Sequence, residues 1–413
     1  MAAQPSKTEN FSASPEEIPK AERAAQLLVV RLSAMGDVAM MVPVLRVVTA
    51  TYPNLKITVL TRAFFAPVLK DIHNVEVFEA DIKGLHSGIF GLYRLAKDLR
   101  NLGINAVADL HNVLRSKVLK FFFYFYEIPV KQIDKGRAEK KLLTSEKNKV
   151  FKQLKSTHQR YVDVFAELGY PIDLKNHKYP PKQILSQKIS EITGTNFLKW
   201  VGVAPFAQHD SKVYPLDLME EVLDKLNQSG KQKIFLFGGG KSETKKLEAL
   251  AFKFENVISI AGKLKFEEEL ALISNLDVML SMDSGNAHLA AMYGVPVITL
   301  WGVTHPYAGF KAFDQPMENC ILPDLQKFPK IPTSVYGNVV PEGYEDVMRS
   351  IPPEKVVEKI KAPQPPKGEE KNKRILTLVR ILLFKPRKGG SQKIIQKKKC
   401  SPFGGWGAAY TSS

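Results

Sequence analysis

Short runs of consecutive apolar residues alternate along the chain with longer segments in which apolar residues recur every three to four positions. The first run predicts a strand over residues 27–31, and the periodic segment after it predicts a helix over 38–51. The order then repeats, with predicted strands at 56–60, 75–78 and 106–110 and a predicted helix at 89–102. Strands that alternate with helices in this way form parallel sheets covered by helices. The first half of the chain is therefore expected to be a doubly wound α/β domain.

The same alternation restarts after residues 170–187, a segment with three prolines and several lysines that predicts a connection between two domains. The later pattern predicts strands at 200–204, 233–237, 257–260, 278–281 and 296–301 and helices at 216–228, 266–276 and 285–293. The second half is therefore also expected to be doubly wound α/β. A chain of 413 residues exceeds what one hydrophobic core usually holds, which agrees with two domains.

Composition indicates an ordinary globular protein in a reducing compartment. The chain is 44% hydrophobic and 24% charged, both usual values for a soluble protein. Cys320 and Cys400 are its only cysteines, so no disulfide framework is expected. The first 25 residues are polar and show no apolar stretch of the kind found in cleavable signals. We therefore expect a cytoplasmic protein with a flexible extension over residues 1–25.

The net charge of +17 is concentrated in the last part of the chain. Residues 362–413 hold twelve Lys or Arg against two Glu, which leaves only +7 for the rest. Because this tail is poor in core-forming patterns, we expect it to be disordered. Within it, the apolar stretch 375–384 is flanked by basic residues and could lie on an anionic membrane surface, although it is too short to cross one. A tail without a role is the alternative, and nucleic-acid binding is disfavoured.

Gly36 and Asp37 form the first candidate site, at the turn between the first predicted strand and helix. Glycine at such a turn allows a substrate to approach the backbone closely, and a carboxylate beside it could act as a general base. The alternative is that Asp37 only caps the following helix. The chain has no GxGxxG motif at this turn, which disfavours a dinucleotide-dependent enzyme.

A second turn, Asp283-Ser284-Gly285-Asn286-Ala287-His288, lies at the corresponding position in the second half. It follows the predicted strand 278–281 and opens a predicted helix, whose first backbone N–H groups attract phosphate. Ser284 could add a hydroxyl donor, and Gly285 would permit close approach of a ligand. His288 could face the same ligand or be a packed, hydrogen-bonded histidine. Without a ligand, Asp283 would serve as a helix cap.

The third candidate is Lys212, in the polar loop that follows the first predicted strand of the second half. A lysine at the carboxyl end of a strand can neutralise the charge that develops on a departing diphosphate. An exposed lysine in a polar loop is more often only solvated. The expectation that all three loops meet at one cleft favours the functional interpretation, since open α/β sheets bind ligands at the carboxyl ends of their strands.

These three motifs, taken in their order and spacing over residues 26–315, resemble the bacterial heptosyltransferase family (glycosyltransferase family 9), which builds the inner core of lipopolysaccharide. The resemblance implies a GT-B fold, with two Rossmann-like domains facing a central cleft. Residues 26–185 would bind the acceptor and residues 186–361 the nucleotide sugar. It further implies metal-independent, inverting transfer of heptose from ADP-heptose to a lipid-linked saccharide, without a cofactor.

Roles for individual residues follow from the same resemblance. Asp37 matches the catalytic base, and Lys212 matches the lysine that contacts the donor phosphates. The residues that match or adjoin the family's donor-binding positions are Gly36, Ala207, Gln208, Glu243, Asp283, Ser284, Gly285 and His288. The family usually carries paired threonines where this chain has Ala207 and Gln208, so the donor's sugar and nucleotide stay open. The same fold with another nucleotide sugar, a nucleotide-sugar epimerase and a non-catalytic binder are the alternatives.

Acceptor recognition is expected to involve cations of the first half. Arg115, Arg137 and Lys140 could bind phosphate or carboxylate groups of an acceptor made of lipid A and Kdo, or could simply be solvated. The aromatic run 120–126 predicts either a buried element or a patch that holds a lipid-linked acceptor at a membrane. The expected partners are thus a sugar nucleotide, a lipid-linked acceptor and, transiently, the inner face of the inner membrane, but no nucleic acid.

Overall fold

A computed structural model of the chain describes residues 25–194 and 198–366. The extension predicted for residues 1–25 and the basic tail predicted for 362–413 lie almost wholly outside the described residues and stay predictions. None of the described helices is long and apolar enough to span a bilayer.

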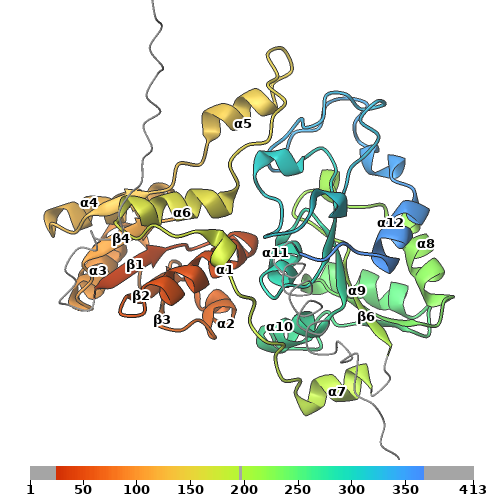
Figure 1. The fold of residues 1–413 in the computed structure, drawn as a ribbon, viewed down its shortest axis with the longest axis horizontal. Coiled ribbons are helices and arrows are strands. Elements are labelled where there is room, and N and C mark those ends of the chain that lie inside the picture. Colours follow the sequence, from red (N-terminus) through yellow and green to blue (C-terminus); the bar gives the residue numbers. More distant parts are fainter. Residues whose placement is uncertain (1–24, 195–197, 367–413) are drawn as a thin grey trace, which may run out of the picture. The chain divides into compact units, whose positions relative to one another are not determined.

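Five parallel strands make up the first sheet, in the order β3-β2-β1-β4-β5 (Figure 1). They are β1 (Gln26–Val30), β2 (Lys56–Thr61), β3 (Val75–Glu79), β4 (Ala106–Asp109) and β5 (Val130–Gln132). β1 pairs with β2 on one side and β4 on the other, with Val29 opposite both Val59 and Ala108. The strand order therefore reverses beside β1, and the carboxyl end of β1 opens into the crevice where such sheets bind ligands.

Helices cover both faces of this sheet because side chains of a buried strand point alternately to either side. The elements are α1 (Met35–Thr51), η1 (Ala63–Phe65), α2 (Ala66–Leu69), α3 (Gly88–Asn101), α4 (Leu114–Phe125), α5 (Arg137–Leu143) and α6 (Thr157–Glu167). Leu27 and Val29 of β1 belong to one buried cluster with residues of α1 and α6. Leu28 and Val30 belong to another with residues of α3 and α4.

A second sheet of six parallel strands follows, in the order β11-β10-β9-β6-β7-β8. These strands are β6 (Lys199–Ala204), β7 (Gln232–Leu236), β8 (Val257–Ser259), β9 (Val278–Met282), β10 (Val297–Leu300) and β11 (Cys320–Ile321). Its α-helices are α7 (Gln187–Thr193), α8 (Leu216–Asn227), α9 (Gly240–Ala251), α10 (Phe266–Asn275), α11 (Gly285–Ala291) and α12 (Pro353–Lys361). The short 3-10 turns after α6 are η2 (Leu174–Asn176), η3 (Asp210–Lys212), η4 (Pro306–Ala308), η5 (Met317–Asn319) and η6 (Val347–Ser350). The order reverses again at β6, which lies between β9 and β7.

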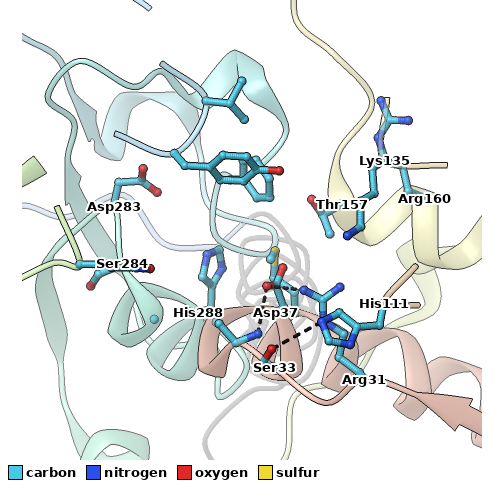
Figure 2. A pocket seen from close by; sticks show the side chains of 18 of the residues that line it. Arg31, Ser33, Asp37, His111, Lys135, Thr157, Arg160, Asp283, Ser284 and His288 are labelled. Atoms are coloured by element: carbon cyan, nitrogen blue, oxygen red, sulfur yellow. Dashed lines mark hydrogen bonds and ion pairs between the residues drawn. The ribbon is translucent and has the colours of Figure 1, made fainter. Parts of the chain in front are cut away.

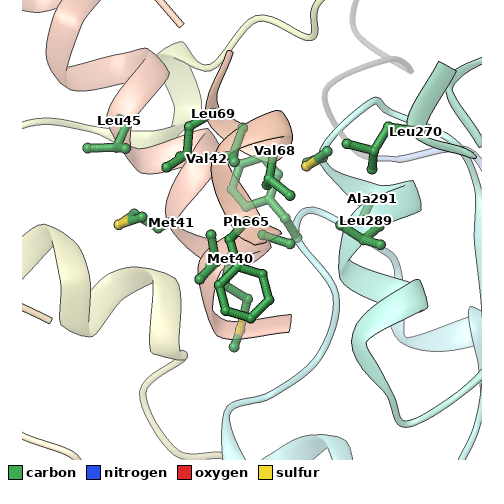
Figure 3. Close-up of a cluster of buried hydrophobic side chains, with 14 of the residues drawn as sticks. Met40, Met41, Val42, Leu45, Phe65, Val68, Leu69, Leu270, Leu289 and Ala291 are labelled. Carbon is green, nitrogen blue, oxygen red and sulfur yellow. The ribbon is translucent and has the colours of Figure 1, made fainter. Parts of the chain in front are cut away.

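One hydrophobic cluster extends from α1 and α2 of the first half to α10 and α11 of the second (Figure 3). Met40 and Phe65 represent the first half in it, and Leu270 and Leu289 the second. Nearly every position of α1 from Val38 onward is buried, as expected for a helix that is apolar all round. α1 therefore packs on its own sheet and also against the second half, which brings the two strand-to-helix turns together.

The elements predicted from the sequence are present, each within a few residues of its expected ends. Several elements were not predicted: the short strands β5 and β11, the short helices α2, α5 and α7, and the longer helices α4, α6, α9 and α12. A strand or helix of two to seven residues is too short to show a periodicity. The aromatic run 120–126 falls at the end of α4 and is buried only in part, and its role in holding an acceptor at a membrane stays a prediction. Phe123 is buried against the sheet, whereas Tyr124 and Phe125 are exposed.

Candidate functional site

A cleft of about 400 Å³ is lined by residues of both halves (Figure 2). Of the predicted site residues, those that line it are Gly36, Asp37, Lys140, Gln208, Lys212, Asp283, Ser284, Gly285 and His288. Arg115 lies on α4 and Arg137 begins α5, and neither is part of this lining. The three loops that carry the sequence motifs therefore share one cavity.

The two strand-to-helix turns meet at a pair of glycines. A Cβ atom on Gly36 would lie 2.9 Å from Cδ2 of His288 and 3.3 Å from the Cα of Gly285. A Cβ atom on Gly285 would lie 2.6 Å from Cε of Met35. Gly36 is therefore needed for the two turns to come this near, because a Cβ atom there would meet the His288 ring, whereas at Gly285 the flexible end of Met35 can shift.

Asp37 stands in the first turn of α1 with its carboxylate in the cleft. The carboxylate forms an ion pair with the buried guanidinium of Arg31 and accepts a hydrogen bond from the backbone N–H of Ala34 at 3.3 Å. Its side chain is 24% exposed, so part of it stays free for a ligand. The capping role considered from the sequence is thus present, together with a charge partner that the sequence did not indicate.

Contacts with Arg31 and Tyr161 fix the position of Asp37. Arg31 follows β1, and its Nη1 donates to the carbonyl oxygen of Leu110 at 2.6 Å. The buried hydroxyl of Tyr161 on α6 donates to the carbonyl oxygen of Asp37 at 3.3 Å. A charge-assisted pair with a buried guanidinium fixes the position of a carboxylate. The Asp37 side chain is therefore oriented before any ligand binds.

His111 presents a neutral imidazole to the same part of the cleft. Burial lowers the pKa of His111 to about 4, and the charges of Arg31 and Lys135 act in the same direction. Its Nδ1 accepts from the backbone N–H of Leu32 at 3.4 Å, which places the ring proton on Nε2. That nitrogen lies 3.5 Å from the hydroxyl oxygen of Ser33, where it can act as a donor.

Lys212 enters the cleft from the second half. Its ammonium lies 3.3 Å from Oδ2 of Asp283, which also accepts from the hydroxyl of Thr304 at 2.9 Å. Both side chains of the ion pair are largely buried. Burial also lowers the pKa of His288, whose Nδ1 has no hydrogen-bond partner among the described residues. A fixed cation, a hydroxyl at Ser284 and a neutral imidazole thus face the cavity.

Further cations line the part of the cleft contributed by α5 and α6. These are Lys135, Lys140 and Arg160. Burial lowers the pKa of Lys140 to about 8, with the charge of Arg160 acting in the same direction, and its ammonium lies 4.1 Å from the centre of the Phe310 ring. Several cations that face one cavity and share few carboxylates favour an anionic ligand.

A second cavity, of about 370 Å³, shares Gln208, Ser284 and Gly285 with the cleft. Two other predicted donor residues, Ala207 and Glu243, line it. The Glu243 carboxylate accepts from the backbone N–H of Gly239 at 2.9 Å, in the glycine-rich turn before α9. All the donor-binding residues predicted from the sequence therefore line one of two adjoining cavities.

The sequence did not single out Arg31, His111, Arg160 or Tyr336. It also did not single out the aromatic residues that line the second cavity, Phe64, Phe206, Phe237 and Phe266. Arg31 is the last residue of one predicted strand and His111 directly follows another, positions that could have marked them. Arg160 and Tyr336 carry no comparable signal, because they reach the cleft only through the packing of distant segments.

In residues 25–194 and 198–366, no three His, Cys, Asp or Glu side chains are grouped as metal ligands are.

Two parallel-sheet α/β domains with a shared cleft form the GT-B fold, which the chain shares with a solved glycosyl transferase family 9 structure. Residues 92–333, more than half of the chain, match the family Glycosyltransferase family 9 (heptosyltransferase). The chain belongs to this family.

Individual relatives agree with this assignment. The chain is 26% identical over 301 residues to the lipopolysaccharide core heptosyltransferase OpsX of Haemophilus influenzae, covering 69% of this chain and 81% of the relative. It is 26% identical to lipopolysaccharide heptosyltransferase 1 of Campylobacter coli, covering 68% and 85%. Among solved structures, a glycosyl transferase family 9 protein of Veillonella parvula superposes with a TM-score of 0.64 at 20% identity, covering 82% of this chain and 96% of that one. An Escherichia coli heptosyltransferase solved with ADP gives 0.57 at 20% identity, covering 81% and 99%.

Proposed function

We propose that this glycosyltransferase transfers heptose, with inversion, from ADP-heptose to a lipid-linked saccharide of the lipopolysaccharide inner core. The observation that carries the proposal is the placement of Asp37 and Lys212, from opposite halves of the molecule, in one cleft. Direct displacement at an anomeric carbon needs a base on the acceptor side and charge stabilisation on the leaving-group side. These two residues are suited to the two tasks.

In the proposed reaction Asp37 takes the proton from the acceptor hydroxyl. The freed electron pair of that oxygen forms the new bond to the anomeric carbon, while the bond from this carbon to the donor phosphate breaks on the opposite face. Lys212 neutralises the negative charge that the departing diphosphate gains, and Asp283 holds the lysine in position. Ser284 and His288 offer further polar contacts to the donor. Arg31 holds Asp37 in position before the reaction.

The donor would occupy the part of the cleft beside Lys212 and the second cavity. Its diphosphate would lie beside Lys212, and its nucleoside would extend into the second cavity, where Glu243 could accept from ribose hydroxyls. The Escherichia coli heptosyltransferase solved with ADP supports an adenine nucleotide through the shared fold. In this proposal residues 186–361 form the donor domain.

The acceptor would occupy the side formed by residues 26–185. Lys135, Lys140 and Arg160 could bind its carboxylate or phosphate groups, and Arg115 and Arg137 stay candidates outside the lining of the cleft. The names of the relatives support an acceptor from the lipopolysaccharide core. Because such an acceptor is anchored in a bilayer, the enzyme would work at the inner face of the inner membrane.

Titration calorimetry with ADP-, GDP- and UDP-linked sugars tests the donor assignment. We expect selective binding of ADP-sugars, and a loss of roughly tenfold or more in affinity in Lys212→Ala, because a charge-assisted contact to the diphosphate is removed. Lys253→Ala is the matched control, since Lys253 is an exposed lysine whose ion-pair partner is Glu220 on α8. Preference for another nucleotide would retain the mechanism and reject ADP-heptose. Binding of no sugar nucleotide would reject the proposed function.

A further inference from the structure

The outer surfaces of α3 and α4 carry large aromatic side chains in contact with solvent. They are Phe90 and Tyr93 on α3 and Phe121, Tyr124 and Phe125 on α4. Phe90 is 87% exposed and Tyr124 is 77% exposed, so these rings do not belong to the core. We call this surface the α3–α4 face. The two helices pack against each other on one side of the first sheet.

Contacts between rings make most of this surface continuous. The centre of the Tyr93 ring lies 5.4 Å from that of Phe122, which lies 5.8 Å from Phe121. Phe121 in turn lies 4.9 Å from Phe125, and Phe90 precedes Tyr93 by one helical turn. A continuous patch of exposed aromatic side chains marks a surface that interacts with something else.

The charges around these rings indicate the kind of partner. Exposed cations flank the aromatic residues on both helices, namely Arg94 and Lys97 on α3 and Lys117 and Lys120 on α4. Aromatic rings favour the interfacial region of a bilayer, and Lys and Arg beside them reach anionic headgroups. The combination fits the surface of a membrane that contains anionic lipid.

The position of α4 relative to the cleft agrees with such a partner. α4 begins three residues after His111, which lines the cleft, and ends at the exposed Phe125. A helix of this length measures about 18 Å. If the aromatic end of α4 lies on a membrane, the cleft lies about one helix length from that membrane. The saccharide of an acceptor could then reach Asp37 while its lipid stays in the bilayer.

We propose that the α3–α4 face docks on a bilayer rich in anionic phospholipid. The inference deepens the proposed function by placing its membrane contact on defined residues. Its test contains neither donor nor acceptor, so a failure would leave the transferase proposal standing.

Flotation of the full chain with vesicles of phosphatidylglycerol and phosphatidylethanolamine tests the docking face. We expect the triple variant Phe90→Ser, Phe121→Ser, Phe125→Ser to partition at least roughly tenfold more weakly than wild type, because three apolar side chains no longer leave water. Phe252→Ser is the matched control, since Phe252 is 93% exposed on the second half and should have no effect. A second variant, Lys97→Gln with Lys117→Gln, should lose the preference for phosphatidylglycerol over phosphatidylcholine.

Two results would overturn this inference. One is wild-type partitioning of the triple variant, which would place any membrane contact elsewhere on the chain, including its basic tail. The other is a wild-type dimer that the triple variant breaks in light scattering, which would make the α3–α4 face an interface between copies. Thermal unfolding of each variant checks that these exposed substitutions leave the fold intact.

A second inference concerns Glu269 in the second cavity. The walls of this cavity are aromatic, with Phe206, Phe237 and Phe266 among its lining residues. Phe64 of the first half also lines it and stacks on Phe266, with ring centres 4.8 Å apart and planes 11° from parallel. Such walls suit a flat ligand such as a nucleobase.

Glu269 is the one acidic residue on these walls that has no partner in the described parts of the chain. It forms no hydrogen bond or ion pair there, whereas Glu243 across the cavity accepts from a backbone N–H. Burial alone raises the pKa of Glu269 to about 7. Charged groups on neighbouring elements have other contacts: Lys70 pairs with Glu267, Lys188 pairs with Glu268, the Lys246 ammonium lies 5.9 Å from the centre of the Phe206 ring, and His288 lines the cleft.

The protonated and ionised forms of a carboxyl group recognise different nucleobases. The neutral group offers one donor and one acceptor on neighbouring atoms, whereas the carboxylate offers acceptors only. Adenine presents its N6 amino donor beside a ring-nitrogen acceptor, which matches the neutral group. Guanine presents two neighbouring N–H donors on its pairing edge, which match the carboxylate.

We infer that Glu269 is a specificity-determining residue that selects adenine in the donor nucleotide. This inference rests on the proposed function, because it requires the nucleoside to occupy the second cavity. Glu269 would thereby distinguish adenine from guanine in a pocket whose aromatic walls would stack on any base.

Calorimetry with ADP-glucose and GDP-glucose at about pH 6 and about pH 8 tests this inference. Sugar nucleotides are chosen because none of their phosphate groups titrates between these two pH values. The neutral carboxyl group is present below the raised pKa and is lost as pH rises through it. We therefore expect ADP-glucose to bind roughly tenfold more weakly at the higher pH, the effect of one lost hydrogen bond to a buried group. In Glu269→Gln the side-chain amide keeps a donor beside an acceptor at any pH, so this variant should bind ADP-glucose equally at both pH values.

The outcomes separate the inference from the function. ADP-glucose binding that is independent of pH in wild type and unchanged in Glu269→Ala would overturn the role of Glu269 and leave the donor assignment intact. Absence of binding by either sugar nucleotide would reject both. Substituting Glu248, an acidic residue of α9 that does not line the cavity, with Gln provides the matched control.

Discussion

Asp37→Asn is expected to lower kcat by about a thousandfold, within the range that general-base catalysis contributes. The amide keeps the size of the carboxylate and can still accept from the backbone N–H of Ala34, but it cannot take a proton. Donor affinity should change little, because Asp37 belongs to the half that is proposed to bind the acceptor. Single-turnover rates with saturating donor, together with calorimetric donor binding, measure the two effects separately.

Two controls accompany this variant. Asp163→Asn replaces a carboxylate of α6 that pairs with Lys155 outside the cleft, and it should retain wild-type turnover. Thermal unfolding reports how much the fold suffers when Arg31 loses its charge partner, since an unpaired buried charge is destabilising. Turnover of Asp37→Asn close to wild type, in a folded protein, would exclude Asp37 as the base.

The alternating pattern of the sequence was sufficient to predict the fold because each strand of a doubly wound sheet is short, apolar and followed by a periodic helix. The motifs at Gly36–Asp37 and 283–288 could also be located, since each occupies a strand-to-helix turn. Their approach to one another depends on α1, whose apolar residues on all sides favour burial between the two halves. The sequence therefore contained the signal for both strand-to-helix turns and, in the apolar residues of α1, the signal for their approach to one another.

The charges around the turns could not be predicted in the same way. Arg31 reads as the end of a strand, and only the structure shows its guanidinium paired with Asp37 and bonded to Leu110. Arg160 reaches the cleft because α6 packs beside α1, a contact between segments more than 100 residues apart. Periodicity reports which face of an element is buried, but not which distant side chain meets it there.

Two ion pairs line the cleft, Arg31 with Asp37 and Lys212 with Asp283. In the first pair the proposed reacting group is the anion, and in the second it is the cation. On the acceptor side a buried cation, Arg31, holds the carboxylate that would act. On the donor side a carboxylate, Asp283, holds the cation that would act. Each pair holds its reacting group in position before a ligand binds, as preorganised sites that stabilise developing charge do. The arrangement also predicts that removing either supporting partner will have a smaller effect than removing the reacting group.

Lys212→Ala is expected to lower kcat/KM by about a hundredfold to a thousandfold, the effect of removing one preorganised group that stabilises transition-state charge. Loss of the ammonium also leaves Asp283 with Thr304 as its remaining side-chain partner, so that a carboxylate would face the donor diphosphate. Donor binding should therefore weaken through repulsion as well as through the lost contact. Steady-state kinetics and calorimetry on the same preparation measure the two contributions.

The double variant Lys212→Ala, Asp283→Asn separates these causes. Removing the carboxylate as well should restore part of the donor affinity, because the repulsion disappears, while turnover stays low because no cation faces the leaving group. Asp283→Asn alone should cost less than Lys212→Ala, since the lysine remains. A double variant that binds donor no better than Lys212→Ala would show that Asp283 does not face the phosphates. Wild-type kcat/KM in Lys212→Ala would remove the lysine from the proposed mechanism.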